Sequence, residues 1–170
     1  MATNTFAAFL IALRMAESGG DYQAVNTLNF IGAYQFGEAA LIDLGYVRSD
    51  RDVYDNDFSG GWTGKNGIRS VQGFLENERE QDRAAQRWMR LMWTYIEYND
   101  IDGYAWEMVG QTQLTTSGML AASHLLGAGA LKEYIESNGR TDPRDPYGMP
   151  LSSYIARLGG YDIPFAPDEA

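Results

Sequence analysis

A single acidic residue, Glu17, stands where an apolar helix is predicted to end. The run from Phe6 to Leu13 is almost wholly apolar, and Gly19 and Gly20 follow Glu17 as a helix stop signal. A carboxyl group there loses solvent to the apolar turn and faces the negative end of the helix dipole, and both effects favour its protonated form. Such an acid can donate a proton to a leaving oxygen. The residues alone leave open the alternative that Glu17 is an ordinary solvated side chain at a helix end.

The residues after Glu17 extend this signal into a longer pattern. Glu17-Ser18-Gly19 leads into Ala24-Val25-Asn26, then into Gly32-Ala33-Tyr34-Gln35, and finally into Leu44-Gly45. This run resembles the soluble lytic transglycosylases of the lysozyme-like superfamily, whose pattern reads Glu-Ser-Gly, Ala-Val-Ser and Gly-Leu-Met-Gln. The resemblance implies that Glu17 is the catalytic acid and that Ser18 and Gln35 line the site.

The chain departs from the family pattern at two places in this run. Asn26 stands where the family usually has Ser, and Ala33-Tyr34 replace Leu-Met. Tyr34 in place of Met would change the floor of a substrate groove and leave the proton donor unaffected. We therefore expect Asn26 and Tyr34 among the substrate-binding residues.

A second stretch of the same resemblance lies near the C-terminus. Residues 122–134 are similar to the family's Ala-Tyr-Asn-Ala-Gly-Pro-Gly motif, and Gly127 and Gly129 match its two glycines. His124 stands where the family has a Tyr that orients the acid or contacts the sugar. His124 is thus either a substrate-side residue or a hydrogen-bonded core histidine. As a lone histidine in a chain without cysteine it makes a poor metal site.

The family chemistry is cleavage of the MurNAc-β-1,4-GlcNAc bond of peptidoglycan. In a lytic transglycosylase the C6 hydroxyl of the sugar attacks, so one Glu can act as acid and then as base. In a lysozyme a second carboxylate assists water. The acid-rich segment 46–66 offers Asp55 and Asp57, which have the aromatic neighbours Tyr54, Phe58 and Trp62. Other candidates are Asp50, Asp52, Glu38 and Asp43, and the alternative for each is a solvated carboxylate.

The expected fold is all-α and lysozyme-like, with a small irregular β-turn or hairpin after the catalytic helix, in a single domain over residues 1–170. Thr3 or Thr5 is expected to cap the first helix. Further helices are expected over about 35–44, 68–76, 78–99, 118–126 and 131–137, with Ser152 or Ser153 capping a last one to Leu158. Segment 46–66 should be a long loop. The second half of helix 78–99 is so apolar that we expect burial on most of its sides, with Trp88 and Trp93 in the core.

The composition limits the classes of molecule that this chain is expected to bind. A net charge of −10 argues against nucleic acid, and no apolar run is long enough to span a membrane. The expected partner is the peptidoglycan glycan strand, and we expect no metal and no organic cofactor. The N-terminal apolar run has no basic segment before it and no cleavage site before Glu17, so we expect no signal peptide. Action on the bacterial cell wall, in the periplasm or outside the cell, would then need an export signal that this sequence lacks, or another route such as a phage particle, a secretion assembly or a delivery module.

Two other functions remain open at this point. The first is a glycan-binding or structural module that keeps the fold without activity, although the intact Glu17 speaks against it. The second is a chitosanase-like or chitinase-like glycoside hydrolase, for which the acidic charge is the only hint. A fold by itself would not identify the substrate.

Overall fold

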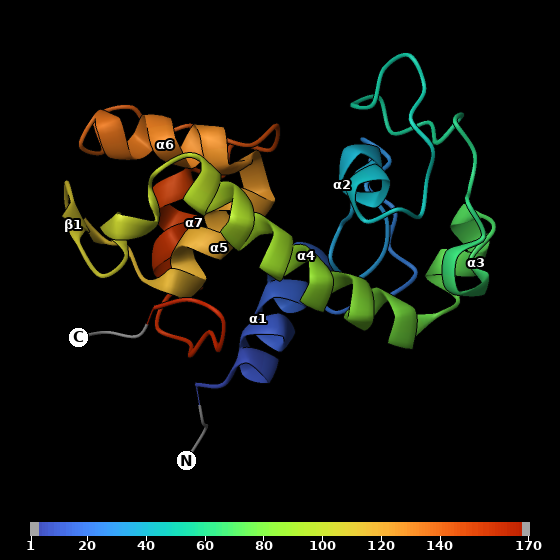
Figure 1. Cartoon of the computed structure of the whole chain (residues 1–170), viewed down its shortest axis with the longest axis horizontal. Helices are drawn as coiled ribbons and strands as arrows, with labels where there is room; N and C mark the ends of the chain where they lie inside the picture. Colours follow the sequence, from blue (N-terminus) through green and yellow to red (C-terminus); the bar gives the residue numbers. More distant parts are fainter. Residues whose placement is uncertain (1–3, 168–170) are drawn as a thin grey trace. The chain divides into compact units, whose positions relative to one another are not determined.

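The computed structural model describes residues 4–167 and is mainly helical, as predicted (Figure 1). The α-helices are α1 (Phe6–Ser18), α2 (Glu38–Asp43), α3 (Val71–Leu75), α4 (Glu78–Tyr98), α5 (Thr116–Leu126), α6 (Ala128–Glu136) and α7 (Leu151–Arg157). Two short 3₁₀ helices span Lys65–Gly67 and Asp102–Tyr104. The strands β1 (Met108–Val109) and β2 (Thr112–Gln113) form an antiparallel hairpin.

The residues gather into two compact units. One comprises residues 10–88, and the other comprises, among the described residues, 4–9 together with 89–167. Both boundaries fall inside helices, one in α1 and one in α4. The single domain predicted over residues 1–170 stays a prediction.

The unit of residues 10–88 has an aromatic core. The ring of Phe36 packs edge-on against those of Phe74 and Trp88, at centroid distances of 6.0 and 6.5 Å, and Tyr46 packs against Phe74 at 5.7 Å. Such edge-to-face pairs add to the free energy gained from burying the rings. Leu13 brings the end of α1 into this core, because its side chain is fully buried.

The other unit is built around α5. Every residue from Thr116 to Ser123 is buried, and α6 and α7 both pack against this helix. Gly118 is required there because a Cβ at that position would lie 2.8 Å from the backbone oxygen of Ile155 in α7. The β1–β2 hairpin also belongs to this unit, and β2 contacts α7.

The expectation that the second half of α4 is buried on most sides is wrong. Its buried residues recur at helical spacing along one face, including Met89, Met92 and Ile96, whereas Tyr98 is 86% exposed. The helix that is buried all round is α5, whose small residues allow close neighbours on every side. Trp88 and Trp93 are buried, as predicted.

The predicted helix ends are partly confirmed. Thr5 caps α1 through a hydrogen bond from the Ala8 amide to its Oγ1, and Thr115 caps α5 in the same way through Gly118. Thr3, the alternative cap, lies outside the described residues. The predicted cap at Ser152 or Ser153 is wrong, because α7 begins at Leu151 and already includes both serines.

Several helix starts also differ from the prediction by two or three residues, as those of α2 and α6 illustrate. Helix α2 begins at Glu38 and not near residue 35, because Phe36 pairs with Ile31 and Gly37 is extended. Helix α6 begins at Ala128 because Gly127 alone, with φ 86°, separates it from α5. None of the helices within residues 4–167 combines the length and the apolar character needed to cross a bilayer.

Candidate functional site

Glu17 lies in the last turn of α1 and is partly exposed. The two glycines after it take up left-handed conformations, with φ 69° at Gly19 and 85° at Gly20. Their amides donate to the carbonyls of Met15 and Arg14, each at 3.1 Å. These bonds satisfy carbonyl groups that a helix end would otherwise leave open. The helix therefore stops directly after the candidate acid and leaves it at the rim of the unit's core.

Ser18 connects the two halves of the motif. Its hydroxyl donates to the carbonyl oxygen of Ala33 at 2.8 Å, with the carbonyl of Arg14 at 3.2 Å. Ala33 belongs to the Gly-Ala-Tyr-Gln run, fifteen residues further along the chain. The serine that follows the candidate acid thus positions the second half of the motif beside the first.

A buried glutamine on α4 holds the other side of this loop. Gln81 is fully buried, and its Oε1 accepts from the Ala33 amide at 2.8 Å while its Nε2 donates to the Tyr22 carbonyl at 3.0 Å. A Cβ at position 32 would lie 2.3 Å from that Oε1, so only glycine fits there. Gly32 also has φ 77°, a conformation that side chains disfavour.

Gln35 has an unusual backbone for a residue expected to open a helix. Its φ is 49°, and its side-chain amide donates to the Gly32 carbonyl at 2.9 Å. It lies in a tight turn, partly exposed, three residues before α2 begins. The turn keeps Gln35 in the same loop as Ala33, but its contact with a substrate stays a prediction.

Tyr34 is almost completely buried, with only 2% of its surface exposed. Its hydroxyl donates to Oδ1 of Asp82 at 2.8 Å, and the hydroxyl of Tyr22 donates to the same oxygen at 2.9 Å. Arg14 donates to Tyr22 and lies 3.5 Å from Asp82. In this arrangement Tyr34 anchors the motif loop to α4, whereas a groove floor would need its ring exposed.

This network also affects the ionisation of the two tyrosines. Burial, followed by the hydrogen bond to Asp82, raises the pKa of Tyr22 to about 12, and the same causes raise the pKa of Tyr34 further. Both phenols therefore stay protonated at neutral pH and act as hydrogen-bond donors.

Asn26 organises its own turn. Its side-chain oxygen accepts from the amides of Leu28 and Phe30, at 2.9 and 3.0 Å. The turn continues into isolated antiparallel bridges that join Val25 to Ile31 and Ile31 to Phe36. A small irregular β feature was expected at this place, after the first helix. A substrate contact by Asn26 stays a prediction.

His124 belongs to the other unit, where it lies partly exposed in the last turn of α5. The glycine that follows this turn, Gly127, donates its amide to the Ser123 carbonyl at 2.8 Å. Gly127 ends α5 and precedes α6, whereas Gly129 already lies in the first turn of α6. The substrate-side role of His124 stays a prediction.

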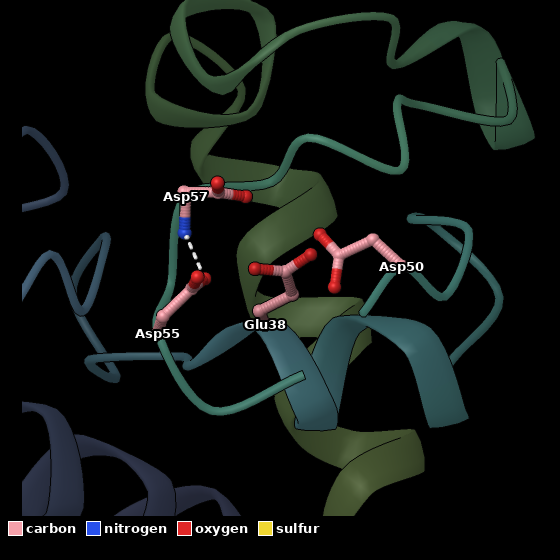
Figure 2. A group of neighbouring side chains, drawn as sticks. All are labelled: Glu38, Asp50, Asp55 and Asp57. Atoms are coloured by element: carbon pink, nitrogen blue, oxygen red, sulfur yellow. Dashed lines mark hydrogen bonds between the residues drawn. The ribbon is translucent and has the colours of Figure 1, made fainter. Parts of the chain in front are cut away.

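Asp55 and Asp57 lie in a carboxylate cluster, which we call the acidic cluster. It contains Glu38, Asp50, Asp55 and Asp57, and one carboxylate oxygen of each lies within 4.8 Å of the others. Figure 2 shows Glu38 on α2 with the three loop carboxylates arranged around it. Phe58 and Trp62 stack at 6.0 Å at the end of this loop, where Phe58 is buried and Trp62 is partly exposed.

The positioning residues Gln81 and Asp82 were missed in the sequence. A signal for Asp82 was present in Arg14, the lone basic residue of an otherwise apolar helix, which requires an acidic partner. No comparable signal pointed to Gln81, because a polar residue in the first turns of a long helix is usually solvated.

Comparisons with protein-family models, with curated proteins and with solved structures give no match for this chain.

Proposed function

We propose that this protein is a peptidoglycan-cleaving muramidase with a lysozyme-like fold, and that Glu17 is its general acid. The observation that carries the proposal is the hydrogen bond from Ser18 to Ala33. It joins the two halves of the transglycosylase-like motif next to a glutamate that is partly accessible at the end of a helix. A proton donor for a bound glycan needs such access together with fixed neighbours.

The proposed reaction is intramolecular transglycosylation. Glu17 gives its proton to the leaving glycosidic oxygen while the bond from that oxygen to the anomeric carbon breaks. The C6 hydroxyl of the muramic sugar then bonds to the anomeric carbon and returns a proton to Glu17. The products are a 1,6-anhydro end and a new hydroxyl on the leaving sugar, and no water is consumed.

The acidic cluster supports this single-acid scheme over a lysozyme scheme. Asp55 and Asp57, the candidates for a second carboxylate, lie with Glu38 and Asp50. A carboxylate that serves water attack needs the reacting sugar opposite it and not three further carboxylates. The proposed place of action is the bacterial cell wall. With a net charge of −10, approach to an anionic wall should be faster at higher salt or with a delivery module.

Release of soluble fragments from purified peptidoglycan tests the role of Glu17. Glu17→Gln keeps the size of the side chain but removes the acidic proton, so we expect a loss of about 10²- to 10⁴-fold in the rate of release. Glu76→Gln is the matched control, because Glu76 is an exposed glutamate of the same unit whose partner is Gln72. Equal rates for wild type and Glu17→Gln would overturn the assignment of the acid.

A further inference from the structure

The acidic cluster contains a buried carboxylate oxygen that no protein group satisfies. Glu38 has no exposed surface, and its Oε2 accepts from the Phe58 amide at 2.9 Å. Its Oε1 is buried and has no geometric hydrogen bond from a donor within residues 4–167, and the side chain that interacts with the Glu38 carboxyl is another carboxyl group, that of Asp50. Burying an unpaired carboxylate oxygen costs folding free energy, so we expect a partner for this atom in the native protein.

The chain itself places only negative charge around this oxygen. No ion pair within the described part of the chain reaches Glu38, Asp50, Asp55 or Asp57. The missing partner is therefore expected to be a cation.

The loop is built to keep these carboxylates together. The side-chain oxygen of Asn56 accepts from the Glu38 amide at 2.7 Å, and its nitrogen donates to the Leu28 carbonyl at 2.9 Å. Ser59 donates to Oδ2 of Asp50 at 2.7 Å. A Cβ on Gly60 would lie 1.8 Å from the Arg48 carbonyl oxygen, so the loop closes tightly there. Like charges are thus held together by neutral contacts.

The separations between the carboxylate oxygens can be compared with the metal–oxygen bond lengths of common cations. Calcium binds carboxylate oxygens at about 2.3–2.6 Å, so two oxygens on opposite sides of the ion lie about 4.6–5.2 Å apart. The oxygens of the acidic cluster lie within 4.8 Å of one another, a separation that one calcium ion can bridge. Calcium accepts several carboxylates in a flexible geometry, whereas magnesium demands a near-ideal octahedron and prefers to keep several waters.

We propose that Glu38, Asp50, Asp55 and Asp57 bind one calcium ion, which holds loop 50–59 against the start of α2 (Figure 2). The ion supplies the partner that Glu38 Oε1 lacks and offsets the repulsion among the four carboxylates. This site departs from the expectation of a metal-free protein. Its role is structural, and it does not depend on the proposed muramidase function.

Thermal unfolding of the full chain, with calcium chloride as the probe, tests the proposal. Starting from protein dialysed against EDTA at pH 7.5 and constant ionic strength, 10 mM calcium should raise the unfolding midpoint by about 5 °C or more. The same concentration of magnesium should give a smaller shift. Titration calorimetry with calcium chloride should show a single site.

Three variants locate the site. Glu38→Gln keeps the shape of the buried ligand and Asp57→Asn changes an exposed one, and each should lose most of the calcium shift. Asp52→Asn is the matched control, because Asp52 is an exposed aspartate of the same loop outside the acidic cluster. It should retain the shift. If Glu38→Gln fails to fold, the loss of the calcium shift in Asp57→Asn still tests the site.

Two outcomes would overturn the proposal. The first is the absence of both a calcium-dependent shift and binding heat in the wild-type protein, which would mean that a proton shared within the cluster satisfies Glu38. The second is an equal loss of the shift in Asp52→Asn and Asp57→Asn, which would mean diffuse screening of the loop charge. Since the readout is stability and not cleavage, failure here leaves the role of Glu17 untouched.

Discussion

Glu38 and Glu80 are both buried glutamates of the same unit, yet the chain gives them opposite surroundings. Glu80 is 3% exposed and accepts hydrogen bonds from Tyr46 and from Asn66. Arg83 and Arg87 each lie 3.6 Å from its carboxylate. These groups outweigh the cost of burial and hold the pKa of Glu80 below its ordinary value.

Glu38, by contrast, has one backbone donor and three aspartates around it, and burial holds its pKa above the ordinary value. The comparison teaches that this chain supplies cations to a buried carboxylate where the structure needs one. Around Glu38 it places only aspartates, and the calcium ion proposed above would supply the neutralising charge. Glu17 belongs to neither case, because it is partly exposed and can meet a ligand.

The largest expected effect on stability comes from removing the charge of Glu80. Glu80→Gln weakens the bonds from Tyr46 and Asn66 and leaves Arg83 and Arg87 without their partner. We expect a loss of about 2–3 kcal/mol in the free energy of unfolding at pH 7, measured by urea denaturation. A change below about 0.5 kcal/mol would break the comparison, because Glu80 would then be no better satisfied than Glu38.

The same substitution at Glu38 should act in the other direction. In EDTA at pH 7, Glu38→Gln removes a buried charge that has no counter-charge and keeps an oxygen for the Phe58 amide. We expect the free energy of unfolding to rise by about 1 kcal/mol or to stay unchanged. A loss as large as that of Glu80→Gln, again in EDTA, would show that the chain already satisfies the Glu38 carboxylate.

A smaller effect is expected in the pH dependence of stability, to which Glu38 and Glu80 should contribute with opposite sign. The folded-state pKa of Glu38 is raised above its ordinary 4.5, so its contribution is complete below that pH and is lost as the pH rises through the folded pKa. The folded-state pKa of Glu80 is lowered, so its contribution is present above pH 4.5 and is lost as the pH falls through the folded pKa.

Unfolding midpoints in EDTA between pH 4 and pH 7 check this difference. The midpoint of wild type minus that of Glu38→Gln should fall as the pH rises. The midpoint of wild type minus that of Glu80→Gln should fall as the pH drops towards 4. Parallel curves for the two variants would contradict the assignment of opposite surroundings.

The sequence predicted well what depends on neighbours along the chain. Helix α1, its cap at Thr5 and its stop after Ser18 follow from an apolar run bounded by a capping residue and glycines. The resemblance implied only that Ser18 and Gln35 line a site, which stays a prediction, and it did not include the hydrogen bond from Ser18 to Ala33. That hydrogen bond depends on Gln81, whose burial on α4 is a tertiary effect that no local pattern records.

The grouping of the four carboxylates in the acidic cluster could not be predicted from the sequence. The path of loop 46–66 depends on left-handed backbone at Asn56 and Phe58, with φ 57° and 56°, and on the two side-chain bonds of Asn56. Neither feature has a periodicity that could be read in advance. Asp55 and Asp57 were singled out for their aromatic neighbours in the sequence. In the fold, their carboxylates lie close to those of Glu38 and Asp50.

The β1–β2 hairpin was also not predicted. Each strand has two residues, which is too short for an alternating pattern to appear in the sequence. Its turn depends on Gly110, with φ 58°, whose amide donates a hydrogen bond to the side-chain oxygen of Asn138 at 2.9 Å. That contact joins positions far apart in the chain.

Mass spectrometry of the muropeptides released from purified peptidoglycan tests the central claim most directly, with Glu17→Gln alongside the wild type. The account predicts that wild type releases products with 1,6-anhydro muramic ends, lighter by one water than reducing-end muropeptides, and that Glu17→Gln releases almost none. Reducing muramic ends would instead mean a lysozyme with a second carboxylate. No release by the wild type would contradict the claim and favour a glycan-binding module or an enzyme for another glycan, such as chitin or chitosan.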